Sequence, residues 1–209
     1  MRVYKRANRR RLYGEVTDPA AIFETIYRKR LWGKGESASG SGSTVAGTAI
    51  LRADLAVWLE QEEIALFVDL PCGDFNWMRL VRFPAGMRYL GMDIVQEIVD
   101  ENVRRHQTEL ITFRHADILS SELPEADAYF CKDLFIHFPN AEIGNAIRRL
   151  RGKTRFLLAS TFPNTKVNPD IPFGDVRPTN LSLMLGEPVA MLRDFDRSVK
   201  DRYIGVWRL

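Results

Sequence analysis

Apolar residues recur at helical spacing before residue 61 and in short continuous runs after it. The spacing predicts a first helix over residues 18–31, with Asp18 as its N-cap and a proline in its first turn. A second helix is predicted from Ser43 and Thr44, two favourable capping residues, to about Glu60. The apolar stripe of this second helix comprises Ala46, Ile50, Ala53 and Val57.

Beyond residue 65, short apolar runs alternate with amphipathic segments, which is typical of βαβ units and a parallel sheet. The predicted parallel strands cover residues 66–70, 88–93, 111–117, 127–133 and 155–162. Helices are predicted between them at residues 95–106 and 140–150. The last two runs, 188–195 and 202–209, lie close in the sequence, so we expect an antiparallel pair there rather than another crossover.

The 209 residues suit one structural domain, with residues 1–60 forming a basic arm, helices and a Gly/Ser-rich segment, and residues 61–209 forming the core. Hydrophobic residues make up 45% and charged residues 27%, which argues against a chain that is disordered throughout. No apolar run is long enough to span a membrane, no secretory signal is visible, and only two cysteines occur. We therefore expect a cytoplasmic protein.

Basic residues crowd the N-terminus, although the net charge is only +3. They are Arg2, Lys5, Arg6, Arg9, Arg10 and Arg11. Such an arm can bind phosphates or an acidic glycan, but we favour a solvated terminus. No aromatic stacking platform accompanies the arm, so nucleic acid is not favoured as a partner.

The segment FVDLPCGDFNW turns back at the end of the first predicted strand. Asp69 closes this strand, Gly73 lies in the turn, and Asp93 closes the next strand twenty residues after Gly73. Open α/β sheets bind ligands at such strand ends, where an acidic side chain can accept hydrogen bonds from both ribose hydroxyls of an adenosine. The turn can offer backbone N–H groups as well, so the sequence predicts a nucleoside pocket.

The residues around this pocket favour a cationic ligand over a pyrophosphate. The GxGxxG motif of dinucleotide sites is absent, and the carboxylate of Asp74 would repel phosphates. S-adenosylmethionine, with its sulfonium and amino groups, suits that carboxylate. At the end of the third strand, Asp117 can accept from an adenine amino group, and the Ile118 N–H can bind a ring nitrogen. Alternatively, these acids cap strand ends and form turns.

Six blocks spread along the chain carry a resemblance to a known family. They are IYRKRLWGKGESASGSGST, DLPCGDFNW, YLGMDI, FCKDLFIHF, GDVRPTNL and IGVWRL. With these blocks the chain resembles class I S-adenosylmethionine-dependent methyltransferases, and more narrowly a bacterial group of them. The resemblance implies a Rossmann-like α/β fold with a seven-stranded, mostly parallel sheet, an antiparallel last strand, helices on both faces and an N-terminal helical lid.

The resemblance also assigns the strand ends to the parts of the cofactor. Asp93 would bind its ribose, and residues 117–118 its adenine. Its methionine part would be lined by Asp69, Cys72, Gly73 and Asp74. The segment 32–44 would fold over it as a lid rather than form a flexible linker. The whole predicted cofactor site comprises Trp32, Ser37, Gly40, Asp69, Cys72, Gly73, Asp74, Trp77, Asp93, Ile94, Asp117, Ile118 and Lys132. The chain departs from the family in its single turn glycine and in Lys132, where related sequences carry arginine.

Candidates for contact with the methyl acceptor follow the fourth strand, in KDLFIHF. His137 can take the proton of an acceptor hydroxyl near neutral pH, or it can be a packed, hydrogen-bonded core residue. Asp133 is predicted to contact the substrate or the amino end of the cofactor. In the long loop after the fifth strand, Arg177 and Asn180 are predicted to bind the acceptor, or to belong to a turn pinned by Pro178.

No metal site is predicted, because the three histidines show no ligand spacing and neither cysteine has a CxxC partner. Cys72 and Cys131 are expected to be inert, packed thiols. We predict an enzyme that moves the methyl group of S-adenosylmethionine to an oxygen of a small-molecule or saccharide acceptor. Two alternatives remain open: a catalytically silent binding protein with the same fold, and a nucleic-acid methyltransferase guided by the basic arm.

Overall fold

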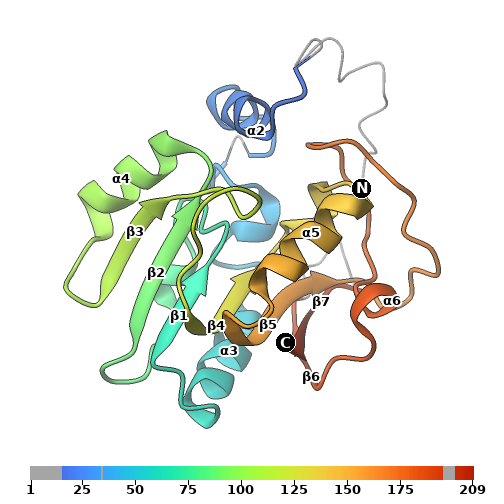
Figure 1. Cartoon of the computed structure of the whole chain (residues 1–209). Coiled ribbons are helices and arrows are strands. Elements are labelled where there is room, and N and C mark those ends of the chain that lie inside the picture. Colours follow the sequence, from blue (N-terminus) through green and yellow to red (C-terminus); the bar gives the residue numbers. More distant parts are fainter. Residues whose placement is uncertain (1–15, 34, 195–200) are drawn as a thin grey trace.

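The computed structural model describes residues 16–33, 35–194 and 201–209 (Figure 1). The basic residues 2–11 lie outside this part of the chain. Within it, seven strands form one sheet in the order β3-β2-β1-β4-β5-β7-β6. The strands are β1 (Leu66–Asp69), β2 (Arg88–Asp93), β3 (Ile111–His115), β4 (Ala126–Cys131), β5 (Thr154–Thr161), β6 (Ala190–Arg193) and β7 (Tyr203–Arg208).

The pairing of the strands confirms the predicted sheet. Strands β1 to β5 pair in parallel, and β7 runs antiparallel to both β5 and β6. From β1 the chain adds β2 and β3 on one side and then crosses to β4 on the other side. The strand order therefore reverses between β1 and β4, and open α/β sheets bind ligands at the carboxyl ends of such a switch point.

Both faces of the sheet are buried, which explains why the strand sequences are continuous apolar runs. Because side chains alternate along a strand, Tyr129 and Cys131 of β4 join one hydrophobic cluster and Ala128 and Phe130 join the other. Helix α5 (Asn140–Leu150) packs into the first cluster and α3 (Ala49–Gln61) into the second. Figure 1 shows the two helices on opposite faces of the sheet.

Most helix predictions agree with the structure. Helix α2 (Pro19–Arg28) begins as expected, with the Ala21 N–H donating to Asp18 Oδ2 at 2.9 Å. It ends at Arg28 rather than at residue 31, since Arg30 adopts a left-handed φ of 48° that a helix cannot continue through. Helix α4 (Gln96–His106) and helix α5 lie within one residue of their predicted bounds. A short helix, α6 (Ser182–Leu185), was not predicted.

The prediction for α3 was wrong in its start and in its buried face. The helix begins at Ala49, after a 3-10 turn over Ser41–Ser43, and Thr48 at its N-cap makes no side-chain capping bond. The expected stripe that includes Ile50 and Val57 lies exposed, with Val57 at 56%. The buried face comprises Leu51, Leu55, Trp58 and Leu59. This second stripe has larger side chains, so burying it removes more apolar surface from water.

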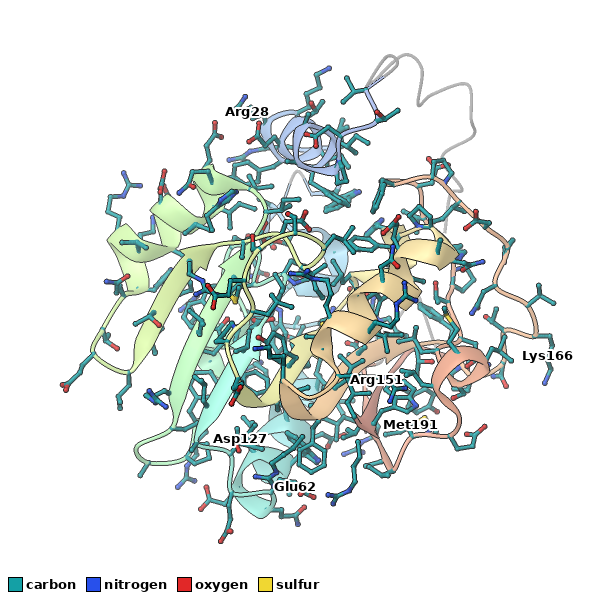
Figure 2. All side chains as sticks on the ribbon, in the orientation of Figure 1. Arg28, Glu62, Asp127, Arg151, Lys166 and Met191 are labelled. Carbon is teal, nitrogen blue, oxygen red and sulfur yellow. The ribbon has the colours of Figure 1, made fainter. Side chains whose placement is uncertain are left out.

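Strands β3 and β4 end two residues before their predicted ends, at His115 and Cys131. Their last predicted residues, Asp117 and Asp133, lie in the turns that follow. Charged side chains such as Arg151 and Lys166 lie on the outside of the molecule (Figure 2). In the described part of the chain, no helix is long and apolar enough to cross a membrane.

Candidate active site

A pocket of about 1050 Å³, measured out to its open mouth, lies at the carboxyl ends of the strands around the switch point. Its walls come from the segments that follow β1, β2, β3 and β4, and from α2, Trp32 and residues 38–43. The lining includes Asp133, His137 and every predicted cofactor residue except Ser37 and Gly40. The predicted set is therefore brought together almost completely.

The turn after β1 is held against β2 by backbone hydrogen bonds. The Cys72 N–H donates to Met92 O at 2.8 Å, and the Gly73 N–H donates to Asp93 Oδ2 at 3.0 Å. The turn also contains a cis Leu70–Pro71 peptide. Gly73 has a left-handed φ of 54°, and a Cβ there would lie 2.3 Å from Ser39 Oγ. Glycine is therefore favoured at this position, which the sequence showed as the single glycine of the turn.

The acidic side chains at the ends of β2 and β3 accept hydrogen bonds from nearby backbone N–H groups. Asp93 also accepts from the Val95 N–H at 3.0 Å, while Asp117 accepts from the Leu119 N–H at 2.9 Å and from Ser120 Oγ at 2.8 Å. The turn-forming role considered for these acids is thus present. Carboxylate oxygens carry further lone pairs, so both side chains can accept additional bonds. The ribose and adenine contacts stay predictions.

Asp69 and Asp93 are buried acids whose pKa values lie above the ordinary value of an aspartate. Asp69 is 3% exposed and accepts from Tyr89 Oη at 2.6 Å. Burial raises the pKa of Asp69 to about 8, and the Asp93 charge adds to this, against the hydrogen bond from Tyr89 and the charge of Lys132. Burial also raises the pKa of Asp93 to about 6, although its backbone hydrogen bonds oppose the rise.

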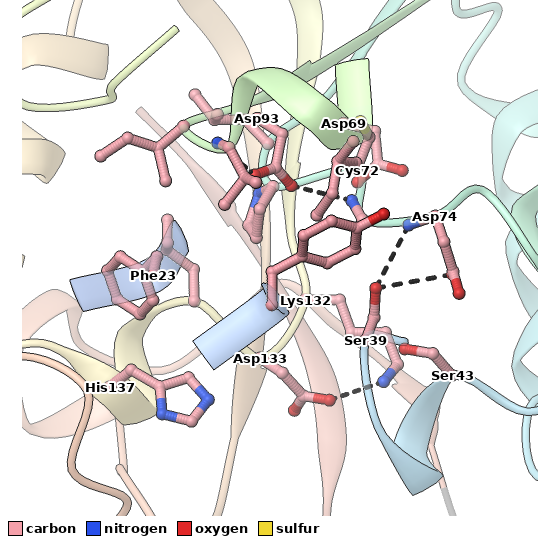
Figure 3. A pocket seen from close by; sticks show the side chains of 18 of the residues that line it. Phe23, Ser39, Ser43, Asp69, Cys72, Asp74, Asp93, Lys132, Asp133 and His137 are labelled. Carbon is pink, nitrogen blue, oxygen red and sulfur yellow. Dashed lines mark hydrogen bonds and ion pairs between the residues drawn. The ribbon is translucent and has the colours of Figure 1, made fainter. Parts of the chain in front are cut away.

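The Gly/Ser-rich segment packs on the β1 turn and is not a free linker. Asp74 accepts from the Ala38 N–H at 2.8 Å and from Ser37 Oγ at 3.0 Å, and its own N–H donates to Ser39 Oγ at 3.2 Å. Figure 3 shows Ser39 and Asp74 facing each other at one side of the pocket. Ser37 thus acts through Asp74. Gly40, with φ 105°, forms the bend beside Trp32.

Several lining residues were missed by sequence reasoning. They are Phe23, Tyr27, Ala38, Ser39, Ser43, Leu70, Pro71, Val95, Ile98, Ala116, Phe130, Leu134 and Phe138. Phe23 and Tyr27 belong to the predicted first helix, and Ser39 and Ser43 lie in the segment that was expected to fold over the cofactor. The sequence pattern therefore predicted the segments that carry these residues, but it did not distinguish positions in the core from positions that line the pocket.

A cluster of two basic and two acidic side chains contacts the Gly/Ser-rich segment at Gly42. It comprises Lys132, Asp133, Asp194 and Arg202, and we call it the charge cluster. Lys132 Nζ donates to Asp133 Oδ2 at 2.7 Å and to Gly42 O at 3.0 Å. Arg202 Nε lies 2.8 Å from Asp194 Oδ2, and Arg202 Nη1 lies 3.6 Å from Asp133 Oδ2. The cluster therefore links three parts of the chain: the end of β4, the β6–β7 hairpin and Gly42 of the Gly/Ser-rich segment.

Asp133 is fixed in both backbone and side chain. Its φ of 55° is left-handed, a conformation that costs a non-glycine residue about 1–2 kcal/mol. Ser160 Oγ of β5 accepts from the Asp133 N–H at 2.8 Å and donates to its Oδ1 at 3.1 Å. Burial raises the pKa of Asp133, but the charges of Lys132 and Arg202 outweigh it and hold this pKa well below its ordinary value. Asp133 is therefore a carboxylate at neutral pH.

His137 closes a 3-10 turn over Phe135–His137 and presents one ring nitrogen as a base. Its Nδ1 lies 3.0 Å from Asp175 O, and its ring stacks on Trp32 with centroids 4.4 Å apart. Because a carbonyl oxygen only accepts, Nδ1 carries the proton and Nε2 keeps its lone pair. Burial lowers the pKa of His137, against the Asp175 carbonyl and the Asp133 charge, so the ring is neutral at pH 7.

Arg177 and Asn180 do not line the pocket. The Arg177 guanidinium is buried and donates to Phe138 O at 2.7 Å and to Asn140 Oδ1 at 2.6 Å, while the Gly174 N–H donates to His137 O at 3.1 Å. This loop therefore clamps the turn that carries His137. Asn180 Nδ2 donates to two carbonyls of its own loop. Their contact with an acceptor stays a prediction.

Cys72 and Cys131 are free and buried. Burial raises the pKa of both thiols, so they are neutral, as expected for inert packing. Among the described residues, no three histidine, cysteine or acidic side chains are grouped so that they could hold a metal ion.

Comparisons with known proteins add to this geometry. No family model and no curated protein sequence matches the chain. Among solved structures, it is similar to magnesium protoporphyrin IX methyltransferase from Synechocystis PCC 6803 with bound S-adenosylmethionine. The TM-score is 0.67 at 17% identity, covering 93% of this chain and 99% of that chain. The chain has the fold of class I S-adenosylmethionine-dependent methyltransferases.

Two further structures share this class I fold. Human N-acetylserotonin methyltransferase in complex with S-adenosylmethionine has a TM-score of 0.62 at 16% identity, covering 90% of this chain and 58% of that chain. Mitomycin 7-O-methyltransferase has a TM-score of 0.58 at 14% identity, covering 91% of this chain and 68% of that chain. At these identities the similarity establishes the fold alone.

Proposed function

We propose that this protein transfers the methyl group of S-adenosylmethionine to a hydroxyl oxygen of a small-molecule or saccharide acceptor. The observation that carries the proposal is the set of acids at adjacent strand ends, with Asp69, Asp93 and Asp117 lining one pocket around the Gly73 turn. Structures of two methyltransferases with this fold contain S-adenosylmethionine, which supports the same cofactor here.

The residues present fit this cofactor. In this proposal Asp93 accepts from the ribose hydroxyls, and the Ile118 N–H binds the adenine; both residues line the pocket. Asp74 offers its side-chain oxygens to the cationic end, buried Asp69 adds a further acceptor oxygen, and Gly73 lets the backbone come close. When bound, S-adenosylmethionine supplies a methyl group on sulfonium sulfur: the acceptor oxygen bonds to the methyl carbon, and the C–S electron pair stays with the sulfur of S-adenosylhomocysteine.

The contribution of the chain itself is positioning and proton removal. In this proposal His137 Nε2 takes the proton of the acceptor hydroxyl, which is supported by the bond between its Nδ1–H and Asp175 O. Asp133, fixed by Ser160 and the charge cluster, holds its carboxylate at the same end of the pocket. Trp32 and α2 cover the site and limit access of water.

The proposal is tested by incubating the full chain with S-adenosylmethionine and a mixed panel of phenols, alcohols and glycosides, and measuring S-adenosylhomocysteine. We expect S-adenosylhomocysteine to form only when a suitable acceptor is present, and we expect the methylated product to be a methyl ether. Tight cofactor binding without turnover on any acceptor would favour the silent binding protein. Turnover only on RNA or DNA, with steeply salt-dependent binding, would favour the nucleic-acid methyltransferase.

A further inference from the structure

One wall of the pocket is built from aromatic rings. Phe23, Trp32, His137 and Phe138 all line the pocket, and we call them the aromatic wall. Trp32 stacks on His137 at 4.4 Å between centroids, and Phe23 lies 5.9 Å from Trp32 and 6.3 Å from Phe138. The rings support one another, so the wall is a preformed apolar surface.

The aromatic wall borders the end of the pocket where the acceptor must enter. The proposed cofactor runs from the end of β3 to the end of β4, and His137 and Phe138 lie beyond β4. In Figure 3, Phe23 and His137 lie on one side of the pocket and Asp74 and Ser39 lie on the other. Two charged residues that also line the pocket, Lys132 and Asp133, are already paired in the charge cluster.

The aromatic wall offers few hydrogen-bonding groups to a polar acceptor. The only polar side-chain atoms of its four rings are the indole nitrogen of Trp32 and the imidazole nitrogens of His137. A saccharide would bring several hydroxyls against these rings, and each hydroxyl left unpaired weakens binding about 5- to 150-fold. An aromatic acceptor would instead gain about 2- to 12-fold in affinity from each ring pair in offset or edge-to-face geometry.

The base at this wall also favours one kind of hydroxyl. Burial lowers the pKa of His137 below its ordinary value, so Nε2 is a weak base. A weak base matches a hydroxyl of low pKa, and a phenol such as tyrosine ionises near about pH 10, far below an ordinary alcohol. In addition, α2 and the lid segment cover the pocket, which favours a small compound.

We propose that the methyl acceptor is a small, planar, largely apolar compound with a phenol-type hydroxyl, which binds against the aromatic wall and gives its hydroxyl proton to His137. This rests on the proposed function and narrows its acceptor from small molecules and saccharides to one chemical class.

The test uses the full chain saturated with S-adenosylhomocysteine and two probes, 2-naphthol and methyl β-D-glucopyranoside, in isothermal titration calorimetry. We expect 2-naphthol to bind at least about tenfold more tightly than the glucoside. Trp32→Ala should weaken 2-naphthol binding about tenfold, and Trp32→Phe, which keeps a ring, should recover most of it. Binding of S-adenosylhomocysteine to each variant is measured first, so that a change in the cofactor site is separated from one in the acceptor site.

Two results would overturn the acceptor class: a glucoside that binds as tightly as 2-naphthol, or 2-naphthol binding that Trp32→Ala leaves unchanged. With S-adenosylmethionine, we expect 2-methoxynaphthalene as the product, and methylation of the glucoside instead would also overturn it. Each of these three results would overturn only the acceptor class and would leave the proposed methyl transfer intact. By contrast, no binding of S-adenosylmethionine or S-adenosylhomocysteine removes the proposed function itself, so the two failures are distinguishable.

Discussion

Replacing Asp69 by asparagine should make the stability of the protein less sensitive to alkaline pH. Asp69 is 3% exposed, and burial raises its pKa to about 8. In an unfolded chain an aspartate has a pKa of about 3.9. Asparagine has nearly the same size, carries no charge, and keeps an oxygen that can accept from Tyr89 Oη, which lies 2.6 Å from Asp69 Oδ2.

The sign of the effect follows from the raised pKa. Between the two pKa values, the folded state holds a proton that the unfolded state has lost. The stability contributed by protonated Asp69 is therefore fully present below about pH 4 and is lost as the pH rises towards about 8. Each pH unit in this window is worth about 1.4 kcal/mol, so the loss between about pH 5.5 and about pH 8 is on the order of 3 kcal/mol.

Urea unfolding at about pH 5.5 and about pH 9 measures this difference. We expect the free energy of unfolding of the wild-type protein to fall by about 3 kcal/mol more than that of Asp69→Asn. Asp100→Asn is the matched control, since Asp100 is an exposed acid of α4, and it should follow the wild type. Parallel losses in the wild type and Asp69→Asn would refute the raised pKa and the buried environment from which it follows.

Three further variants probe the active site. His137→Gln should lower methyl transfer about 10²–10⁴-fold with cofactor affinity little changed, and the wild-type rate should rise through the lowered His137 pKa and level off above it; a rate that does not vary with pH would exclude the base. Gly42→Ala should weaken cofactor binding, because the new Cβ would lie 3.0 Å from Arg202 Nη1. Gly35→Ala should leave binding unchanged, because its Cβ would have no atom within 4 Å. Equal cofactor affinities of the two variants would show that this segment does not contribute to the cofactor site. Arg177→Met should raise the His137 pKa in an NMR titration of the three histidines, because the Arg177 charge lowers this pKa, and an unchanged value would exclude that charge effect.

The parallel core was predictable because its signals are local. Five apolar runs, the helical spacing over residues 96–106 and 140–150, and the closeness of the last two runs each follow from nearby residues. For α3 the sequence carries two apolar stripes at helical spacing, and only the packing against the sheet decides which one is buried. The ends of β3 and β4 were placed too late, since their terminal acids turn away from the ladder.

The candidate site was predictable where topology alone brings residues together. Parallel strands end at one edge of the sheet, so acids at the strand ends had to be neighbours. Asp194 and Arg202 were missed, because they reach the charge cluster from the C-terminal hairpin and carry no motif. The part that Arg177 plays behind His137 depends on how a long loop folds back, which local spacing does not encode.

The central claim is that the acids at the strand ends form a site for S-adenosylmethionine, and direct binding tests it. Isothermal titration calorimetry should give one site per chain for S-adenosylmethionine. Asp93→Ala should weaken binding by about 1–3 kcal/mol, the cost of lost charged hydrogen bonds, while Asp100→Ala should leave it unchanged. No binding to the wild-type protein, or equal affinity in a folded Asp93→Ala variant, would contradict the claim.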